Sequence, residues 1–135
     1  MTAEQFLASR FKALKDADYA AVYAGYHVDA PFLQQFPDAA AYCQFAEQQL
    51  SGIVVNRWSS LRQRQLADGS EEHLLLMELS VDGVSQCFYE LALLIDTAEG
   101  WRYHSAQKLG GDDYTGAPEQ INFSHFDQVS PKIRY

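Results

Sequence analysis

The strongest candidate for chemistry in this chain is Glu90, a carboxylate that is followed directly by the apolar run Leu91–Leu94. A carboxylate in the middle of a strand can act as an acid or a base if it faces a cavity. The alternative is that Glu90 pairs with an arginine or a tyrosine and serves only the fold, because buried ion pairs also occur away from functional sites. The residue pattern leaves both interpretations open.

His27 is the second candidate, because Asp29 stands two residues later and could orient the imidazole. The alternative is a loop cap beside a solvated aspartate in the turn that leads to Pro31. His73 and His104 are isolated within predicted strands, where hydrogen-bonded structural roles are expected. The chain shows no convincing metal-ligand spacing of His, Cys, Asp or Glu, so we predict no metal and no other cofactor.

Several large aromatic residues could line a ligand pocket, because tyrosine and tryptophan combine apolar area with one polar group. Such residues also pack as ordinary core. The predicted ligand-binding residues are Tyr23, Tyr26, Trp58, Trp101 and Tyr103. The partner that they would suit is a small apolar or aromatic molecule.

Three helices are predicted before any strand. Thr2 begins a capping box, and the first helix is expected from about Ala3 to Lys15. Asp16 or Asp18 caps the second helix, and Asp38 caps the third. Apolar residues recur at helical spacing in each, so each helix is expected to bury one face.

Four strands follow the helices. They are expected at about Ile53 to Ala67, Glu72 to Val81, Val84 to Ile95 and Trp101 to Leu109. Asp82-Gly83 is a strong two-residue hairpin signal, which pairs Val81 with Val84. The predicted fold class is α+β, with the N-terminal helices packed on a curved four-stranded antiparallel sheet and a pocket between the two layers.

The hairpin register places apolar residues on both faces of the sheet. One face packs against the helices. The other would expose apolar side chains to water unless the C-terminal segment or another subunit packs on it. We therefore predict a cone domain over 1–109, an irregular segment over 110–135 that packs on the domain or on a partner, and a homodimer through the outer sheet face.

The composition and net charge of the chain limit the classes of partner that it could bind. The chain has 135 residues, of which 47% are hydrophobic, and is long enough to bury a core. A net charge of −8 disfavours nucleic acid, because phosphate binding depends on a positive field. No apolar run is long enough to cross a membrane, and the N-terminus lacks the apolar core of a signal peptide. A cytoplasmic location with neither nucleic acid nor membrane as partner is expected.

Two groups of short motifs stand out over about Thr2 to Leu109. The first group comprises Ser9-Arg10-Phe11, Ala13, Asp16, Asp18-Tyr19 and Tyr26-His27. The second comprises Glu90, which stands eleven residues before Trp101, together with Tyr103 and Trp58. In combination they resemble the bacterial YchJ-like family. The chain departs from the family at Val28, where a proline is usual, and it lacks the Cys-rich zinc-binding SEC-C motif that members often carry.

The resemblance implies the nuclear transport factor 2-like cone, a cystatin-like fold that is shared by ketosteroid isomerase, scytalone dehydratase, polyketide cyclases and many non-catalytic domains. The YchJ-like family has no settled activity. We expect a non-catalytic domain that binds a small molecule in an apolar pocket or mediates an interaction. The alternatives are a cofactor-free isomerase, dehydratase or cyclase that uses Glu90 as acid or base, and a pure dimerisation module.

Overall fold

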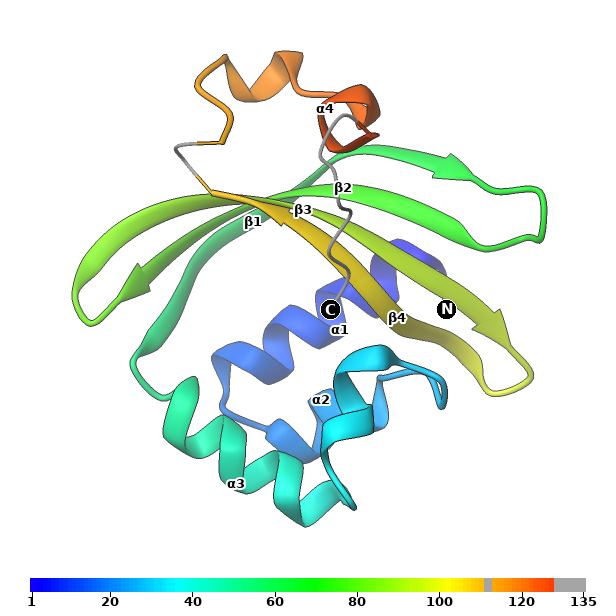
Figure 1. Ribbon diagram of the computed structural model, residues 1–135, viewed down its shortest axis with the longest axis vertical. Coiled ribbons are helices and arrows are strands. Elements are labelled where there is room, and N and C mark those ends of the chain that lie inside the picture. The colour runs from blue at the N-terminus through cyan, green and yellow to red at the C-terminus, as the bar shows by residue number, and fades with distance from the viewer. Residues whose placement is uncertain (111–112, 128–135) are drawn as a thin grey trace.

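The computed structural model describes residues 1–110 and 113–127, in which helices precede a single antiparallel sheet (Figure 1). The elements are α1 (Ala3–Lys15), α2 (Tyr19–Ala24), the 3-10 helix η1 (Pro31–Gln35), α3 (Ala39–Gln49), β1 (Ile53–Gln65), β2 (Glu71–Val81), β3 (Val84–Thr97), β4 (Gly100–Leu109), the 3-10 helix η2 (Pro118–Gln120) and α4 (Phe123–Asp127). The predicted α+β fold class is confirmed, and the arrangement is consistent with the expected cone.

The N-terminal helices begin where their capping residues predict. The Thr2 side chain accepts a hydrogen bond from the Gln5 backbone N–H at 3.1 Å, and the Gln5 side chain accepts one from the Thr2 backbone N–H at 2.8 Å. Asp18 and Asp38 cap α2 and α3 in the same way, each through a carboxylate oxygen. The α2 helix is short, because Gly25 ends it before Tyr26.

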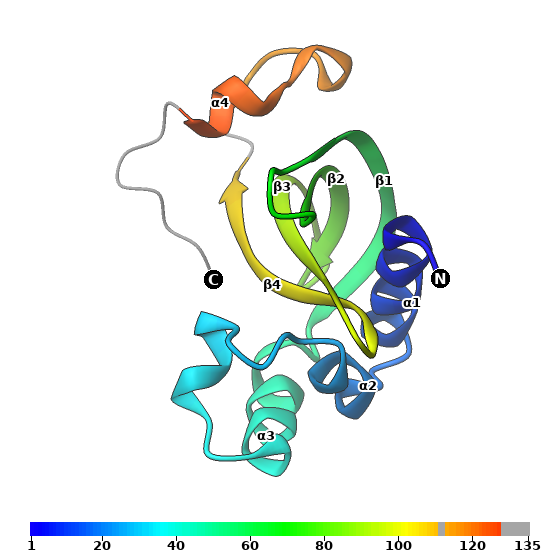
Figure 2. The same cartoon turned by 90° about the vertical axis from the view of Figure 1, so that its right-hand side faces the viewer.

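The four strands pair in chain order as a meander, and Figure 2 shows how strongly they curl. Val81 pairs with Val84, as predicted, and the turn residues Asp82 and Gly83 have φ angles of 51° and 84°. Positive φ at both positions matches the right-handed twist of the flanking strands. Register shifts within β1, and one between Leu93 and Leu94, bend the sheet.

The inner face of the sheet carries the main core. Helix α1 lies across this face and buries Leu7 and Phe11 against residues of β2, β3 and β4. Helices α2 and α3 pack beside α1 and share a second cluster that includes Val22 and Tyr42. Side chains from all three helices therefore meet above the inner face of the sheet.

The outer face is covered in part by the C-terminal segment. Ile121 and Phe126 are fully buried against outer-face residues such as Leu74 and Leu91. The Arg62 side chain donates a hydrogen bond to the Ile121 carbonyl at 2.8 Å, which ties this segment to β1. The remainder of the predicted segment, residues 111–112 and 128–135, lies outside the described residues, and the predicted homodimer through this face stays a prediction.

No helix in the described ranges is both long and apolar enough to cross a bilayer.

Candidate functional site

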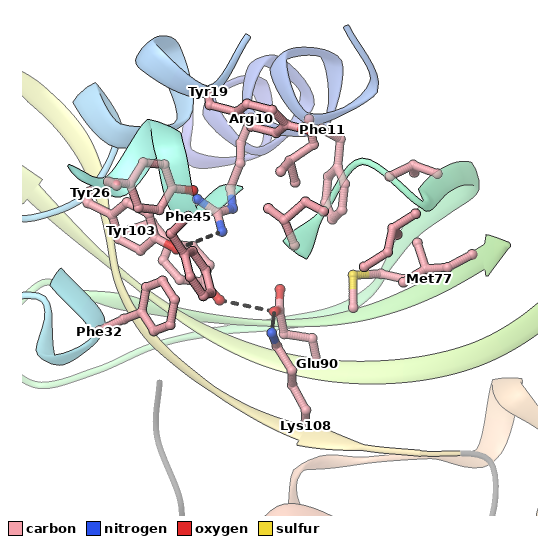
Figure 3. Close-up of a pocket in the computed structure, with 16 residues that line it drawn as sticks. Arg10, Phe11, Tyr19, Tyr26, Phe32, Phe45, Met77, Glu90, Tyr103 and Lys108 are labelled. Carbon is pink, nitrogen blue, oxygen red and sulfur yellow. Dashed lines mark hydrogen bonds and ion pairs between the residues drawn. The ribbon is translucent and has the colours of Figure 1, made fainter. Parts of the chain in front are cut away.

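A cavity of about 460 Å³ lies between the inner sheet face and the helices. Most of its wall is apolar, with Phe11 and Leu14 from α1, Phe45 from α3, and Met77 and Leu79 from β2. Polar groups gather at one end of it (Figure 3). They are Arg10, Tyr26, Tyr42, Glu90, Tyr103 and Lys108.

Strand geometry brings Glu90, Tyr103 and Lys108 together. Glu90 in β3 pairs with Lys108 in β4. Strict alternation would place Tyr103 and Lys108 on opposite faces, because they are an odd number of residues apart. The register shift pairs Leu93 with Ser105 and Leu94 with Tyr103, so that one residue of β4 is unpaired and both side chains reach the cavity.

Tyr26 is held at the cavity by backbone contacts with β4. The His27 N–H donates to the Tyr103 carbonyl, and the Tyr103 N–H donates to the Gly25 carbonyl, each at 2.8 Å. This isolated bridge aligns the end of α2 with the strand. It places the Tyr26 ring edge-on to the Tyr103 ring, with 5.5 Å between the ring centroids.

Glu90 is almost completely buried, with 4% of its surface exposed. The Tyr103 hydroxyl donates a hydrogen bond to Glu90 Oε1 at 3.0 Å, and Lys108 Nζ lies 3.8 Å from the same oxygen. Burial, and then the nearby charge of Glu90, raise the pKa of Tyr103 well above its ordinary value. The Tyr103 phenol therefore stays protonated at neutral pH and remains a hydrogen-bond donor.

Arg10 stacks above the two tyrosines. Its guanidinium carbon lies 3.8 Å from the centroid of the Tyr103 ring and 5.0 Å from that of Tyr26, close enough for cation–π attraction. Arg10 Nη2 donates a long hydrogen bond of 3.5 Å to the Tyr26 hydroxyl. Nη1 is shielded from solvent and has no hydrogen-bond partner.

Arg10 remains positively charged although it is partly buried. Burial acts to lower the pKa of the guanidinium, but Tyr26, Tyr103 and Glu90 together outweigh it and raise the pKa of Arg10 above its ordinary value. Burial also raises the pKa of Tyr42, the phenol contributed by α3. The polar end of the cavity thus holds a permanent cation beside protonated phenols.

The structure brings together three of the predicted site residues. Glu90, Tyr26 and Tyr103 all line the cavity. His27 is not among its lining residues, and its Nδ1 accepts a hydrogen bond from the Asp29 backbone N–H at 3.0 Å, which is the loop-cap arrangement. The His27 ring instead lies beside that of His104, with 5.7 Å between the centroids.

The other predicted aromatic residues pack behind the cavity and do not line it. Trp58 stacks on Phe11 with 4.6 Å between ring centroids, so it supports a lining residue. Tyr23 packs on Tyr42 in the helical cluster, and Trp101 packs against the core on the inner sheet face.

Sequence reasoning did not select Arg10, Tyr42 or Lys108 as site residues. A signal for Arg10 was present, because it falls three residues after Leu7 and four before Leu14, within the apolar stripe of the first helix. A charged residue in such a stripe must reach a partner inside the fold or the solvent beyond it. Lys108 had no comparable signal, because its position depends on the irregularity in β4.

Within 1–110 and 113–127, no three His, Cys, Asp or Glu side chains gather closely enough to hold a metal ion.

Comparison with known proteins adds evidence on the fold. No family model matches the chain, and neither does any curated protein. A solved structure from Catenulispora acidiphila is similar, with a TM-score of 0.55 and 14% sequence identity over 81% of this chain and 88% of that chain. At this level of identity the similarity shows a shared fold.

Proposed function

We propose that this protein binds a small, largely apolar molecule in the cavity beneath α1 and does not transform it. The observation that carries the proposal is the cavity itself. Protein interiors are normally packed to the density of organic crystals, so an opening of about 460 Å³ amid large aromatic residues is a departure from ordinary packing. The volume falls within the range of about 300–1,000 Å³ that is typical of small-molecule sites.

The arrangement of polar groups supports binding in preference to catalysis. Glu90 Oε1 already accepts from Tyr103 and lies near Lys108, so the carboxylate has structural partners before any ligand enters. A few polar groups at one end of an apolar cavity are the usual means of orienting a ligand. The proposal includes membership of the YchJ-like family and a cytoplasmic location. Cys43 and Cys87 form no disulfide, which is in keeping with the reducing environment of the cytoplasm.

Two tryptophan variants of neighbouring residues test the proposal. Val55 lines the cavity, whereas Val54 points away from it and is 54% exposed. The indole of Val55→Trp should occupy ligand space and weaken binding by about tenfold or more, and Val54→Trp should stay within about twofold of wild type. The measurement is a fluorescence titration with N-phenylnaphthylamine, a neutral dye that brightens in apolar surroundings.

Either of two results would refute cavity binding. The wild-type protein could leave the dye dark at all concentrations, or both variants could bind it with equal affinity. Circular dichroism of each variant establishes that the fold is intact before the titration.

A second candidate function is acid–base catalysis without a cofactor. It is favoured by the hydrogen bond between Tyr103 and Glu90 at the cavity wall. A buried phenol beside a carboxylate can polarise a carbonyl group while the carboxylate takes up a proton from the neighbouring carbon.

Proton exchange on a simple ketone separates the two functions. In deuterium oxide, phenylbutanone exchanges the hydrogens next to its carbonyl for deuterium when a base removes them and solvent replaces them. A catalyst should accelerate this exchange about a hundredfold or more, and Glu90→Gln should abolish the acceleration. If the protein only binds its ligand, wild type and Glu90→Gln will both exchange at the rate of buffer, as followed by proton NMR.

A further inference from the structure

The charges around the cavity do not balance. Among the described residues that line it, Arg10 and Lys108 carry positive charges and Glu90 carries a negative one. The phenols of Tyr42 and Tyr103 stay protonated, because burial raises the pKa of each. Counted over these described lining residues alone, positive charges exceed negative ones by one, although the chain as a whole has a net charge of −8.

The excess charge can be assigned to Arg10. Glu90 accepts the Tyr103 hydrogen bond and lies 3.8 Å from Lys108 Nζ, so its nearest partners are these two residues, and it acts on Arg10 only as a nearby charge that helps to raise the pKa of Arg10. None of the ion pairs between described residues includes Arg10. Its polar contact is the long bond to the Tyr26 hydroxyl, and its Nη1 is shielded from solvent with no partner.

Arg10 is only partly buried, but its Nη1 reaches neither solvent nor a partner, so this nitrogen lacks the hydrogen bond that water would otherwise supply. The guanidinium also has a strong geometric preference for carboxylates, to which it can donate two parallel hydrogen bonds. The stacking of Arg10 on Tyr103 and Tyr26 holds the guanidinium in place before a ligand arrives. Both features suit an incoming carboxylate.

We propose that the ligand is a small apolar carboxylic acid, bound as its anion with the carboxylate against Arg10 and the hydrocarbon part against the wall that includes Met77 and Leu79. This inference rests on the proposed binding function and specifies its ligand class. A single carboxylate neutralises the cavity, whereas a phosphate monoester would bring close to two negative charges into a site with one positive charge to offset. A ligand with no acceptor group, or one that carries a positive charge, would leave Arg10 Nη1 without a hydrogen-bond partner.

Three ligands that share one hydrocarbon skeleton test the proposal on the wild-type protein. Phenylbutyrate, phenylbutanol and phenylbutylamine differ only in the head group, which is anionic, neutral and cationic at neutral pH. Each is titrated against protein that is saturated with N-phenylnaphthylamine, and displacement of the dye gives its affinity. Phenylbutyrate should bind about tenfold or more tighter than the alcohol, and the amine should bind most weakly.

Variants of Arg10 locate the source of the preference. Arg10→Met removes the charge with little change of length and should reduce the preference for phenylbutyrate over phenylbutanol to about twofold or less, while the neutral dye still binds. Arg57→Met is the matched control, because Arg57 pairs with Glu78 at the surface and its side chain is 67% exposed. This control should keep the full preference.

The outcomes separate the two proposals. If the dye binds and phenylbutanol displaces it as well as phenylbutyrate does, the anionic ligand class is refuted and cavity binding stands. The anionic ligand class is refuted in the same way if Arg10→Met keeps the wild-type preference. If the wild-type protein does not bind the dye, cavity binding is refuted, and the ligand class that rests on it fails with it. Should Arg10→Met not fold, Arg10→Lys decides, because the loss of the paired donors should reduce the preference about threefold or more.

Discussion

Replacing Glu90 with leucine should lower the free energy of unfolding by about 3 kcal/mol, and adding Arg10→Met should restore at least about 1 kcal/mol of that loss. Tyr103 links the two residues, since its ring lies 3.8 Å from the Arg10 guanidinium and its hydroxyl lies 3.0 Å from Glu90 Oε1. Glu90→Leu leaves the Tyr103 hydroxyl buried without its acceptor and removes the negative charge that faces Arg10. Removing Arg10 as well eliminates part of that penalty.

Urea unfolding of the wild type, the two single variants and the double variant completes a thermodynamic cycle. A matched cycle on Arg57 and Glu78, which form an exposed pair at 2.8 Å, should give a coupling energy below about 1 kcal/mol. Strict additivity of Glu90→Leu and Arg10→Met would mean that the two charges act independently, and would refute a single polar cluster at the end of the cavity.

The fold was predictable from the sequence because its signals are local. The caps at Thr2 and Asp38 fix where helices begin, and each is satisfied by a backbone N–H three residues later. The two-residue turn at Asp82-Gly83 fixes the register of β2 on β3, and with it the face on which Glu90 lies. The alternation of side chains then predicts which residues of that hairpin share a face, but both faces are apolar, so it does not predict which one meets the helices.

The candidate site was only partly predictable, because it joins separate elements. Arg10 reaches Tyr103 only through the way α1 crosses the sheet. Lys108 shares a face with Tyr103 only because the register shifts between Leu93 and Leu94. Neither the angle at which a helix crosses a sheet nor a register shift within a strand produces a periodic pattern of residues in the sequence. The residues at the polar end of the cavity therefore could not be identified from residue spacing alone.

The aromatic residues show a second limit of sequence reasoning. Trp58 and Tyr103 are both large and partly polar, yet Tyr103 lines the cavity whereas Trp58 stacks behind Phe11. A large aromatic residue gains from burial of apolar area in either position, so residue type alone does not distinguish a residue that lines the cavity from one that packs behind it. The distinction depends on which side of the α1–sheet contact each ring occupies.

The free energy of unfolding should fall steeply as the pH rises above about 10, where tyrosines in the unfolded chain begin to ionise. Burial raises the pKa of both Tyr42 and Tyr103 in the folded protein. Below about pH 10 the folded and unfolded states both keep these protons, and the stabilisation is fully present. At higher pH the unfolded chain releases them and the folded chain keeps them, so the stabilisation declines until the folded-state pKa is reached.

Each of these tyrosines should contribute a slope of about −1.4 kcal/mol per pH unit, or about −2.8 kcal/mol per pH unit for the pair. Urea titrations at a series of pH values between about 9 and 12 measure this slope. Tyr42→Phe and Tyr103→Phe should each make it shallower by about 1.4 kcal/mol per pH unit, whereas Phe32→Leu, which alters the same cavity wall without a phenol, should leave it unchanged. An identical slope in Tyr103→Phe and the wild type would show that this phenol ionises as freely in the folded protein as in water. That result is incompatible with the buried contacts of Tyr103 with Arg10 and Glu90, on which the proposed binding site depends.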